Sequence, residues 1–357
     1  MTVSTSTTTM RAGVLHAPGD LRIEDRPVPV PTADEVLVRV TLNGLCGTDA
    51  TEYSKGPMMV PLERQHPGSG HVGPTILGHE FMGTVVDAGH NARRLVGRRV
   101  VSGAGVSCGR CAWCTHGRTN LCASYYTLGL STHGGLANYV AVPAGTCFEV
   151  PEGCMDQDAA LVQPLAVGMH AVRRAGLRPG QDVLLLGAGA IGSFVLAGLS
   201  RHDGRVVAAD VARERLEAAK ALGASHTVLI DTDAGDEQFD GLFPDGAPVV
   251  FETSGVPGSA ARALRLAARG GTVVLVGLTS TPQPLELAPV VLREVDIRTT
   301  VAHVCAVDVP DALSLLAERP LAAVIVGDVV PLERVVPDGL EALVAGRAPG
   351  KVLVDLR

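Results

Sequence analysis

A glycine-rich turn between an apolar run and an amphipathic stretch is the feature that most constrains the fold of this chain. The apolar run 183–186 leads into Gly187-Ala-Gly-Ala-Ile-Gly192, and the helical stretch 193–199 follows. The first glycine permits a tight turn, the second lets the backbone approach a pyrophosphate, and the third lets the helix pack closely on the strand. The pattern predicts a dinucleotide-binding βαβ unit. The residues expected to bind the dinucleotide in this turn are Gly187, Gly189, Ala190, Ile191 and Gly192.

An acidic residue at the end of the next apolar run predicts which dinucleotide binds. The run 206–209 ends at Asp210, 18 residues after Gly192. A carboxylate at this place accepts hydrogen bonds from the adenosine ribose hydroxyls and repels a 2′-phosphate, so NAD(H) is favoured over NADP(H). Arg213 and Arg215 lie close by and could weaken that preference, although they also fit a solvated helix face. Arg215 is included among the candidate cofactor-binding residues.

The pattern of the chain changes near residue 158. Before it, short apolar runs separated by Gly, Pro and Asn are typical of a partly antiparallel β domain. From 159 to 300, β-branched runs alternate with helical stretches, which predicts a doubly wound parallel sheet. The remainder should carry one helix over 310–318 and a closing strand over 351–355. We therefore expect a flexible tail over 1–10, a β-rich domain over 11–158 and 301–357, and a dinucleotide-binding domain over 159–300.

Four cysteines predict a structural zinc site. They follow the spacing Cys-x2-Cys-x2-Cys-x7-Cys and are Cys108, Cys111, Cys114 and Cys122. Four thiolates close a tetrahedron around zinc and leave no position for a substrate, so such a site holds a loop, here about residues 103–125, rather than catalysing a reaction. The alternative is two disulfides. It is disfavoured because we identify no apolar signal sequence, and because Cys147, Cys154 and Cys305 are scattered along the chain without obvious partners.

Composition argues against several kinds of partner. The formal net charge is −7 and the sequence pI is near 5.9, and no basic stretch is interleaved with aromatic residues, so a nucleic-acid partner is not expected. Apolar runs fall short of the roughly 20 residues that span a bilayer, and the opening residues lack transit-peptide character. We expect a cytoplasmic protein without a membrane partner.

Two further motifs suggest a second, catalytic zinc. They are Cys46-Gly-Thr-Asp49 and Gly78-His-Glu80. A thiolate, an imidazole and a carboxylate around one zinc leave a position open for a substrate oxygen, which the metal would polarise as a Lewis acid. A lone Cys or His is more often structural than a ligand.

The ordered motifs resemble those of the zinc-dependent medium-chain dehydrogenase/reductase (alcohol dehydrogenase) superfamily. The resemblance spans nearly the whole chain, and His66-Pro-Gly-Ser-Gly70 with Pro74-x-x-Leu-Gly-His-Glu-Phe81 resembles the polyol and 2,3-butanediol dehydrogenase branch. It implies an α/β protein with a GroES-like catalytic domain, a Rossmann NAD-binding domain, one catalytic and one structural zinc per subunit, and a homodimer or homotetramer. It also implies that Cys46 and His79 bind zinc, that Glu80 is a ligand or a near neighbour, and that Thr48 relays the alcohol proton.

The sequence departs from that branch at two positions. Gln163 stands where polyol dehydrogenases typically have a glutamate, and Thr51 stands where they often have a histidine. With Cys46, His79, Glu80 and Gln163 as the expected ligands, the amide removes one negative charge near the metal and should leave zinc more electrophilic. The branch resemblance also suggests Glu52 as a carboxylate near the metal, with a buried ion pair as the alternative. Met58 and Met59 suit a substrate pocket or, by default, packing.

The sequence thus predicts a zinc-dependent oxidoreductase that transfers a hydride between NAD and a secondary alcohol or ketone. The substrate is expected to be a small vicinal diol, a polyol or a cyclic sugar-like alcohol. One alternative is a biosynthetic ketone or imine reductase of the same superfamily. Another is a non-catalytic protein that keeps the fold and binds the cofactor.

Overall fold

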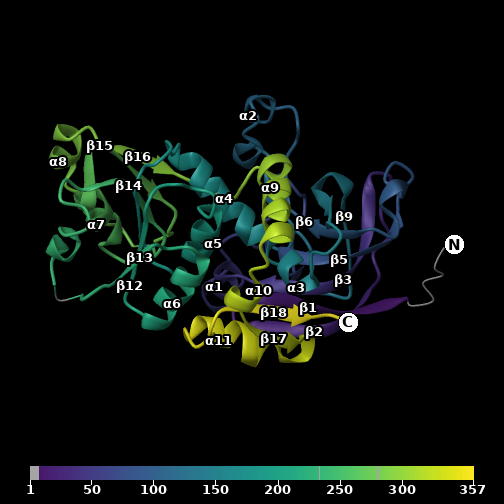
Figure 1. Cartoon of the computed structure of the whole chain (residues 1–357). Helices are drawn as coiled ribbons and strands as arrows, with labels where there is room; N and C mark the ends of the chain where they lie inside the picture. Colours follow the sequence, from purple (N-terminus) through teal and green to yellow (C-terminus); the bar gives the residue numbers. More distant parts are fainter. Residues whose placement is uncertain (1–7, 233, 280) are drawn as a thin grey trace. The chain divides into compact units, whose positions relative to one another are not determined.

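The computed structural model describes residues 8–232, 234–279 and 281–357, which form two compact units (Figure 1). Of the described residues, the first unit contains 8–166 and 303–357, and the second contains 167–232, 234–279 and 281–302. Most of the expected tail over 1–10 lies outside the described residues, and its Thr9 and Met10 begin strand β1. Helix α4 (Val162–Ala175) begins in the first unit and continues in the second.

The first unit is built on three sheets. The largest has the strand order β10-β6-β5-β3-β18-β17, and β9 also pairs with β3. A second sheet has the order β2-β1-β4, and β7 pairs with β8. The strands are β1 (Thr9–Ala17), β2 (Asp20–Pro27), β3 (Glu35–Leu45), β4 (Thr75–Ile76), β5 (Glu80–Ala88), β6 (Arg99–Ser102), β7 (Gly105–Val106), β8 (Tyr126–Thr127), β9 (Tyr139–Pro143), β10 (Cys147–Glu149), β17 (Val326–Pro331) and β18 (Lys351–Asp355).

Short helices and one longer helix complete this unit. They are α1 (Gly47–Lys55), α2 (Ala112–Thr115), α3 (Asp156–Ala159), α9 (Cys305–Glu318), α10 (Ala322–Ile325) and α11 (Glu341–Val344). Figure 1 shows α2 at the tip of a lobe that extends from the sheets of its unit. Helix α9 begins five residues before the expected start at 310. The Asp308 carboxylate in its first turn accepts the backbone N–H of Val304, the residue before the helix, at 2.7 Å, and this contact favours the earlier start. The closing strand 351–355 is present as β18.

The second unit is a six-stranded parallel sheet whose successive strands are joined by α-helices, except β13 and β14, which are joined by a 3-10 turn (Asp236–Phe239). The strand order is β13-β12-β11-β14-β15-β16, so the chain reverses direction across the sheet between β11 and β14. The strands are β11 (Val183–Leu186), β12 (Val206–Asp210), β13 (His226–Leu229), β14 (Ala247–Glu252), β15 (Ala267–Leu275) and β16 (Asp296–Thr299), and the helices are α5 (Ala190–Gly198), α6 (Arg213–Leu222), α7 (Ser259–Leu266) and α8 (Leu287–Leu292). This is the doubly wound arrangement that places nucleotides at the carboxyl ends of its strands. The predicted fold class is confirmed.

Candidate functional site

Strand pairing in the first unit brings Cys46, His79 and Glu80 together. Cys46 follows β3 and caps α1, while His79 and Glu80 stand at the start of β5, the strand next to β3. One side-chain donor atom from each of the three residues lies within 4.8 Å of the others. His79 and Glu80 are only 5% and 1% exposed. The two motifs therefore form one cluster with the donor atoms of a metal site, in which His79 and Glu80 are buried and Cys46 is partly buried.

Asp49 orients both Cys46 and His79. One carboxylate oxygen accepts the Cys46 backbone N–H at 2.9 Å, and the other lies 3.3 Å from Nδ1 of His79. The Nε2 atom of His79 is then the ring nitrogen left for a metal. Burial lowers the pKa of His79, but the Asp49 carboxylate outweighs burial and holds that pKa well above its usual range. The sequence reading assigned Asp49 no role, although an acidic residue three positions after a helix cap is a recognisable capping signal.

Glu80 has a buried partner that the sequence reading missed. The Lys351 ammonium group, at the start of β18, forms an ion pair with Oε2 of Glu80. The two side chains are 5% and 1% exposed. Burial lowers the pKa of Lys351, but the charges of Glu80, Cys46 and Asp49 outweigh burial and raise it above its ordinary value. A single lysine opening an apolar strand was the only sequence signal for this pair.

The cluster fits zinc. A thiolate, an imidazole nitrogen and a carboxylate oxygen are donors that zinc accepts, and the buried acidic groups around Cys46 favour a cation. Oγ1 of Thr48 lies 3.7 Å from Sγ of Cys46, so this hydroxyl is beside the candidate metal position. Gln163 lies partly exposed in the first turn of α4, and its role as a ligand stays a prediction.

The four cysteines of the lobe also converge. Their sulfur atoms lie within 4.8 Å of one another. Cys111 and Cys114 are 3.5 Å apart at sulfur, well beyond the roughly 2 Å of a disulfide bond. Sγ of Cys122 accepts two backbone N–H groups at 3.3 Å. Hydrogen bonding from the Cys114 backbone N–H is the largest of the effects that lower the pKa of Cys111 to about 6. This geometry favours a metal over disulfides.

The glycine turn of the second unit has the geometry expected of a dinucleotide cradle. Gly187 has φ of +94°, and a Cβ atom there would lie 2.9 Å from Cβ of Ser254. A Cβ on Gly189 would meet open space, so this residue faces an accessible side at the start of α5. A Cβ on Gly192 would collide with the Gly187 carbonyl oxygen. The backbone therefore requires glycine at 187 and 192, while Gly189 leaves its accessible side open for the approach of a pyrophosphate.

Asp210 joins this turn at the end of β12. Its carboxylate accepts the Ala188 and Ala212 backbone N–H groups at 2.7 and 2.9 Å, and Nη1 of Arg215 lies 3.4 Å away. Asp210 is 4% exposed, whereas the Arg215 side chain is about half exposed. The structure thus brings Asp210 and Arg215 to the same end of the sheet as the turn.

The structure gives Glu52 neither of its two expected roles, a carboxylate near the metal or a member of a buried ion pair. Its buried carboxylate accepts the backbone N–H groups of Met58 at 2.9 Å and Met59 at 2.6 Å. It thereby closes the loop after α1 instead of joining the metal cluster or an ion pair. The default packing role for the two methionines is also wrong, since Met58 and Met59 are 66% and 45% exposed. A loop that folds back onto the preceding helix has no repeating hydrophobic pattern, so the sequence could not predict this contact.

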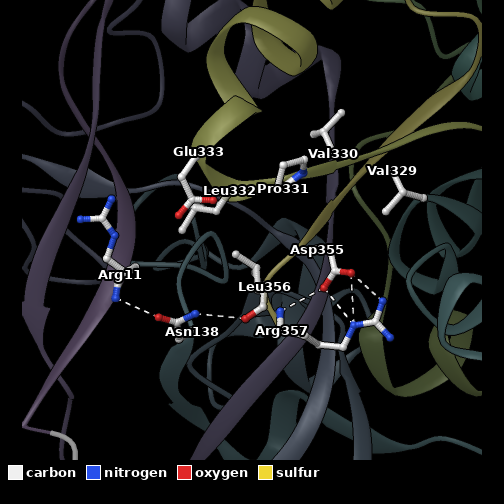
Figure 2. Close-up of a pocket in the computed structure, with 10 residues that line it drawn as sticks. All are labelled: Arg11, Asn138, Val329, Val330, Pro331, Leu332, Glu333, Asp355, Leu356 and Arg357. Carbon is white, nitrogen blue, oxygen red and sulfur yellow. Dashed lines mark hydrogen bonds and ion pairs between the residues drawn. The ribbon is translucent and has the colours of Figure 1, made fainter.

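A cavity of about 470 Å³ in the first unit is separate from these groups (Figure 2). Figure 2 shows Asn138 between the Arg11 backbone N–H and the Leu356 carbonyl, and Arg357 turned onto Asp355. The lining residues are Arg11, Asn138, Val329, Val330, Pro331, Leu332, Glu333, Asp355, Leu356 and Arg357. None of the candidate site residues is among them.

Within residues 8–232, 234–279 and 281–357, no helix is both long enough and apolar enough to span a bilayer.

Comparison with known proteins indicates the family to which the chain belongs. Residues 32–152 match the family model of the alcohol dehydrogenase GroES-like domain, and residues 190–318 match that of zinc-binding dehydrogenases. Sorbitol dehydrogenase of Bacillus subtilis is 34% identical over 293 residues, which is 81% of each chain. The crystal structure of 2R,3R-butanediol dehydrogenase from Bacillus subtilis superposes with a TM-score of 0.89 at 29% identity and covers 97% of this chain and 99% of its own.

Two other similar structures contain a cofactor. A zinc-binding dehydrogenase from Sinorhizobium meliloti, bound to NADP, has a TM-score of 0.84 at 30% identity and covers 98% of this chain and all of its own. An alcohol dehydrogenase from Escherichia coli, complexed with NADH, has a TM-score of 0.87 at 25% identity and the same coverage. With the ordered motifs, these likenesses show that the chain belongs to the zinc-dependent medium-chain dehydrogenase/reductase superfamily, on its polyol dehydrogenase branch.

Proposed function

We propose that this protein oxidises a secondary alcohol of a vicinal diol, a polyol or a cyclic sugar-like alcohol, with NAD as the hydride acceptor. The observation that carries the proposal is the convergence of donor atoms from Cys46, His79 and Glu80 beside the Thr48 hydroxyl. The similar proteins named sorbitol dehydrogenase and butanediol dehydrogenase support a substrate with neighbouring hydroxyl groups.

The proposed roles divide between binding and proton transfer. When bound, zinc supplies Lewis-acid polarisation of a substrate oxygen, and the nicotinamide supplies a hydride acceptor. Cys46 and His79 hold the metal, with Glu80 and Gln163 as further candidate ligands. Asp49 fixes the imidazole through its 3.3 Å contact with Nδ1. The Thr48 hydroxyl, 3.7 Å from the Cys46 sulfur, takes the alcohol proton.

NAD is proposed over NADP because of Asp210. Its carboxylate lies at the end of β12 and is hydrogen-bonded to the backbone of the glycine turn at Ala188. A 2′-phosphate brought to this end of the sheet would meet that negative charge. Arg215 already lies 3.4 Å from the carboxylate, which reduces its availability to a phosphate. Gly187, Gly189, Ala190, Ile191 and Gly192 are the proposed contacts to the pyrophosphate.

We also propose a homodimer or homotetramer in the cytoplasm. Strand β16 is an edge strand of the sheet in the second unit, and large apolar side chains are exposed near it in sequence. They are Leu278, Leu287, Val291, Leu292 and Ile297, between 42% and 93% exposed. Apolar residues exposed in this density are typical of protein interfaces.

The decisive measurement is NADH formation by the purified, zinc-loaded protein with vicinal diols, linear polyols, aldoses, cyclitols and simple secondary alcohols. We expect turnover confined to compounds with neighbouring hydroxyl groups, and a higher rate with NAD than with NADP. Turnover of simple secondary alcohols alone would contradict the substrate class, and a preference for NADP would contradict the role of Asp210. Activity only with ketones and NADH would favour the reductase alternative. Absence of turnover in both directions, with cofactor still bound, would favour a non-catalytic protein.

A further inference from the structure

Three neighbouring strands of the first unit meet at Glu80. The strand order is β5-β3-β18, and Gly44 in β3 is paired with Glu80 on one side and with Leu353 on the other. Glu80 opens β5 and Lys351 opens β18. A Cβ atom on Gly44 would collide with Oε2 of Glu80 and would lie 3.1 Å from Cε of Lys351. The missing side chain of Gly44 is what lets the lysine reach the carboxylate across the middle strand.

The buried cation is a lysine, although most basic residues of the chain are arginines. The chain has 30 Lys and Arg residues, and only three of them are lysines: Lys55, Lys220 and Lys351. One of these three is the cation buried against Glu80, with a side chain only 5% exposed. An ammonium group is a compact point charge, whereas a guanidinium presents a fork of donors that binds both oxygens of a carboxylate. In the structure the Lys351 ammonium group engages Oε2 of Glu80.

Glu80 therefore faces two cationic positions. Its carboxylate pairs with Lys351, and it also belongs to the cluster whose donor atoms lie within 4.8 Å of Cys46 and His79. We propose that Lys351 is a positioning residue that competes with zinc for the Glu80 carboxylate and so keeps one coordination position open for the substrate oxygen. This inference rests on the proposed function, since it concerns zinc at the Cys46 site.

The competition predicts opposite effects for two substitutions. In Lys351→Met, an unbranched side chain of similar length remains but the Glu80 charge is buried without a partner, and zinc is the cation within reach. Glu80 should then bind zinc more strongly. In Lys351→Arg, the guanidinium should hold both carboxylate oxygens, and zinc should lose Glu80. A role limited to packing or folding would shift both variants in the same direction.

The test measures how fast zinc is lost from the Cys46 site to EDTA, in the full-length protein without substrate. We expect loss to be about tenfold slower in Lys351→Met and about tenfold faster in Lys351→Arg, the lower end of the range for residues that act on metal ligands. The visible spectrum of the cobalt-substituted protein should also shift in opposite senses. Lys220→Met is the matched control, because Lys220 is half exposed and pairs with Glu217. It should exchange zinc like the wild type.

A second pair of variants tests the same competition after the Glu80 charge itself has been removed. In the Glu80→Gln background, changing Lys351 to Met should leave zinc loss unchanged, because the group in competition is gone. Shifts in the same direction for Lys351→Met and Lys351→Arg, or unchanged rates in both, would overturn the inference. Wild-type protein that binds zinc only at the four cysteines would instead overturn the proposed function, and this inference with it. Zinc content of the wild type thus separates the two failures.

Discussion

The four-cysteine lobe takes all its donor atoms from residues 108–122, whereas the Cys46 cluster draws its atoms from the end of β3 and the start of β5. The lobe is organised by local turns, in which backbone N–H groups point at sulfur. The Cys46 cluster is organised by pairing between neighbouring strands. A metal in the lobe can therefore fix only that segment, while a metal at the Cys46 cluster is held by the central sheet of its unit.

The two clusters also differ in how their charges are balanced. Three of the four lobe cysteines are only partly buried, so water contributes to their charge balance. The Cys46 cluster is surrounded by Asp49 and Lys351, which are 0% and 7% exposed. Charges buried in this way are stable only when partners are arranged around them. Four sulfurs would complete the coordination of zinc, whereas at the mixed cluster the proposed competition of Lys351 for Glu80 would leave one position for a substrate oxygen.

The largest effect should follow from removing the thiol at the mixed cluster. Cys46→Ser is expected to lower kcat/KM by about a thousandfold or more, because Lewis-acid stabilisation is worth several kcal/mol. Zinc analysis should fall from two ions to one per chain. Steady-state kinetics with the best substrate of the diol and polyol panel provides the measurement. A Cys46→Ser variant that keeps both zinc ions and most of its activity would contradict the proposed functional difference between the two clusters.

The matched change in the lobe should act on stability instead. Cys111→Ser is expected to lower the unfolding free energy by on the order of 4 kcal/mol, the range seen when a structural metal is lost. That corresponds to a fall in the melting temperature of about 10 °C. Thermal unfolding followed by circular dichroism measures it. Turnover per folded molecule below the transition should match the wild type, and a drop comparable to that of Cys46→Ser would contradict the distinction.

These differences also explain what could be predicted from the sequence. The lobe and the glycine turn were predicted from spacing, because all their residues lie within one short segment. The pairing of Cys46 with His79 came from a family resemblance, since the two residues lie 33 positions apart in the chain. The contact between Lys351 and Glu80 was missed because it depends on two strand pairings and on the absence of a side chain at Gly44. Local pattern cannot show which distant strand becomes a neighbour.

The smallest expected effect concerns two threonines three residues apart at α1. Oγ1 of Thr51 donates a hydrogen bond to the Gly47 carbonyl at 2.8 Å, a bond within the helix, whereas Oγ1 of Thr48 lies 3.7 Å from Sγ of Cys46. Thr51→Ala loses only the bond within the helix and gains helix propensity, so kcat should stay within about twofold of the wild type. Thr48→Ala should lower kcat by about a hundredfold or more, because a positioned proton acceptor is lost. Comparing kcat for the two alanine variants at saturating substrate measures the difference. Equal losses in the two would mean that proton transfer passes along both hydroxyls, and that the site reaches further along α1 than the Cys46 cluster.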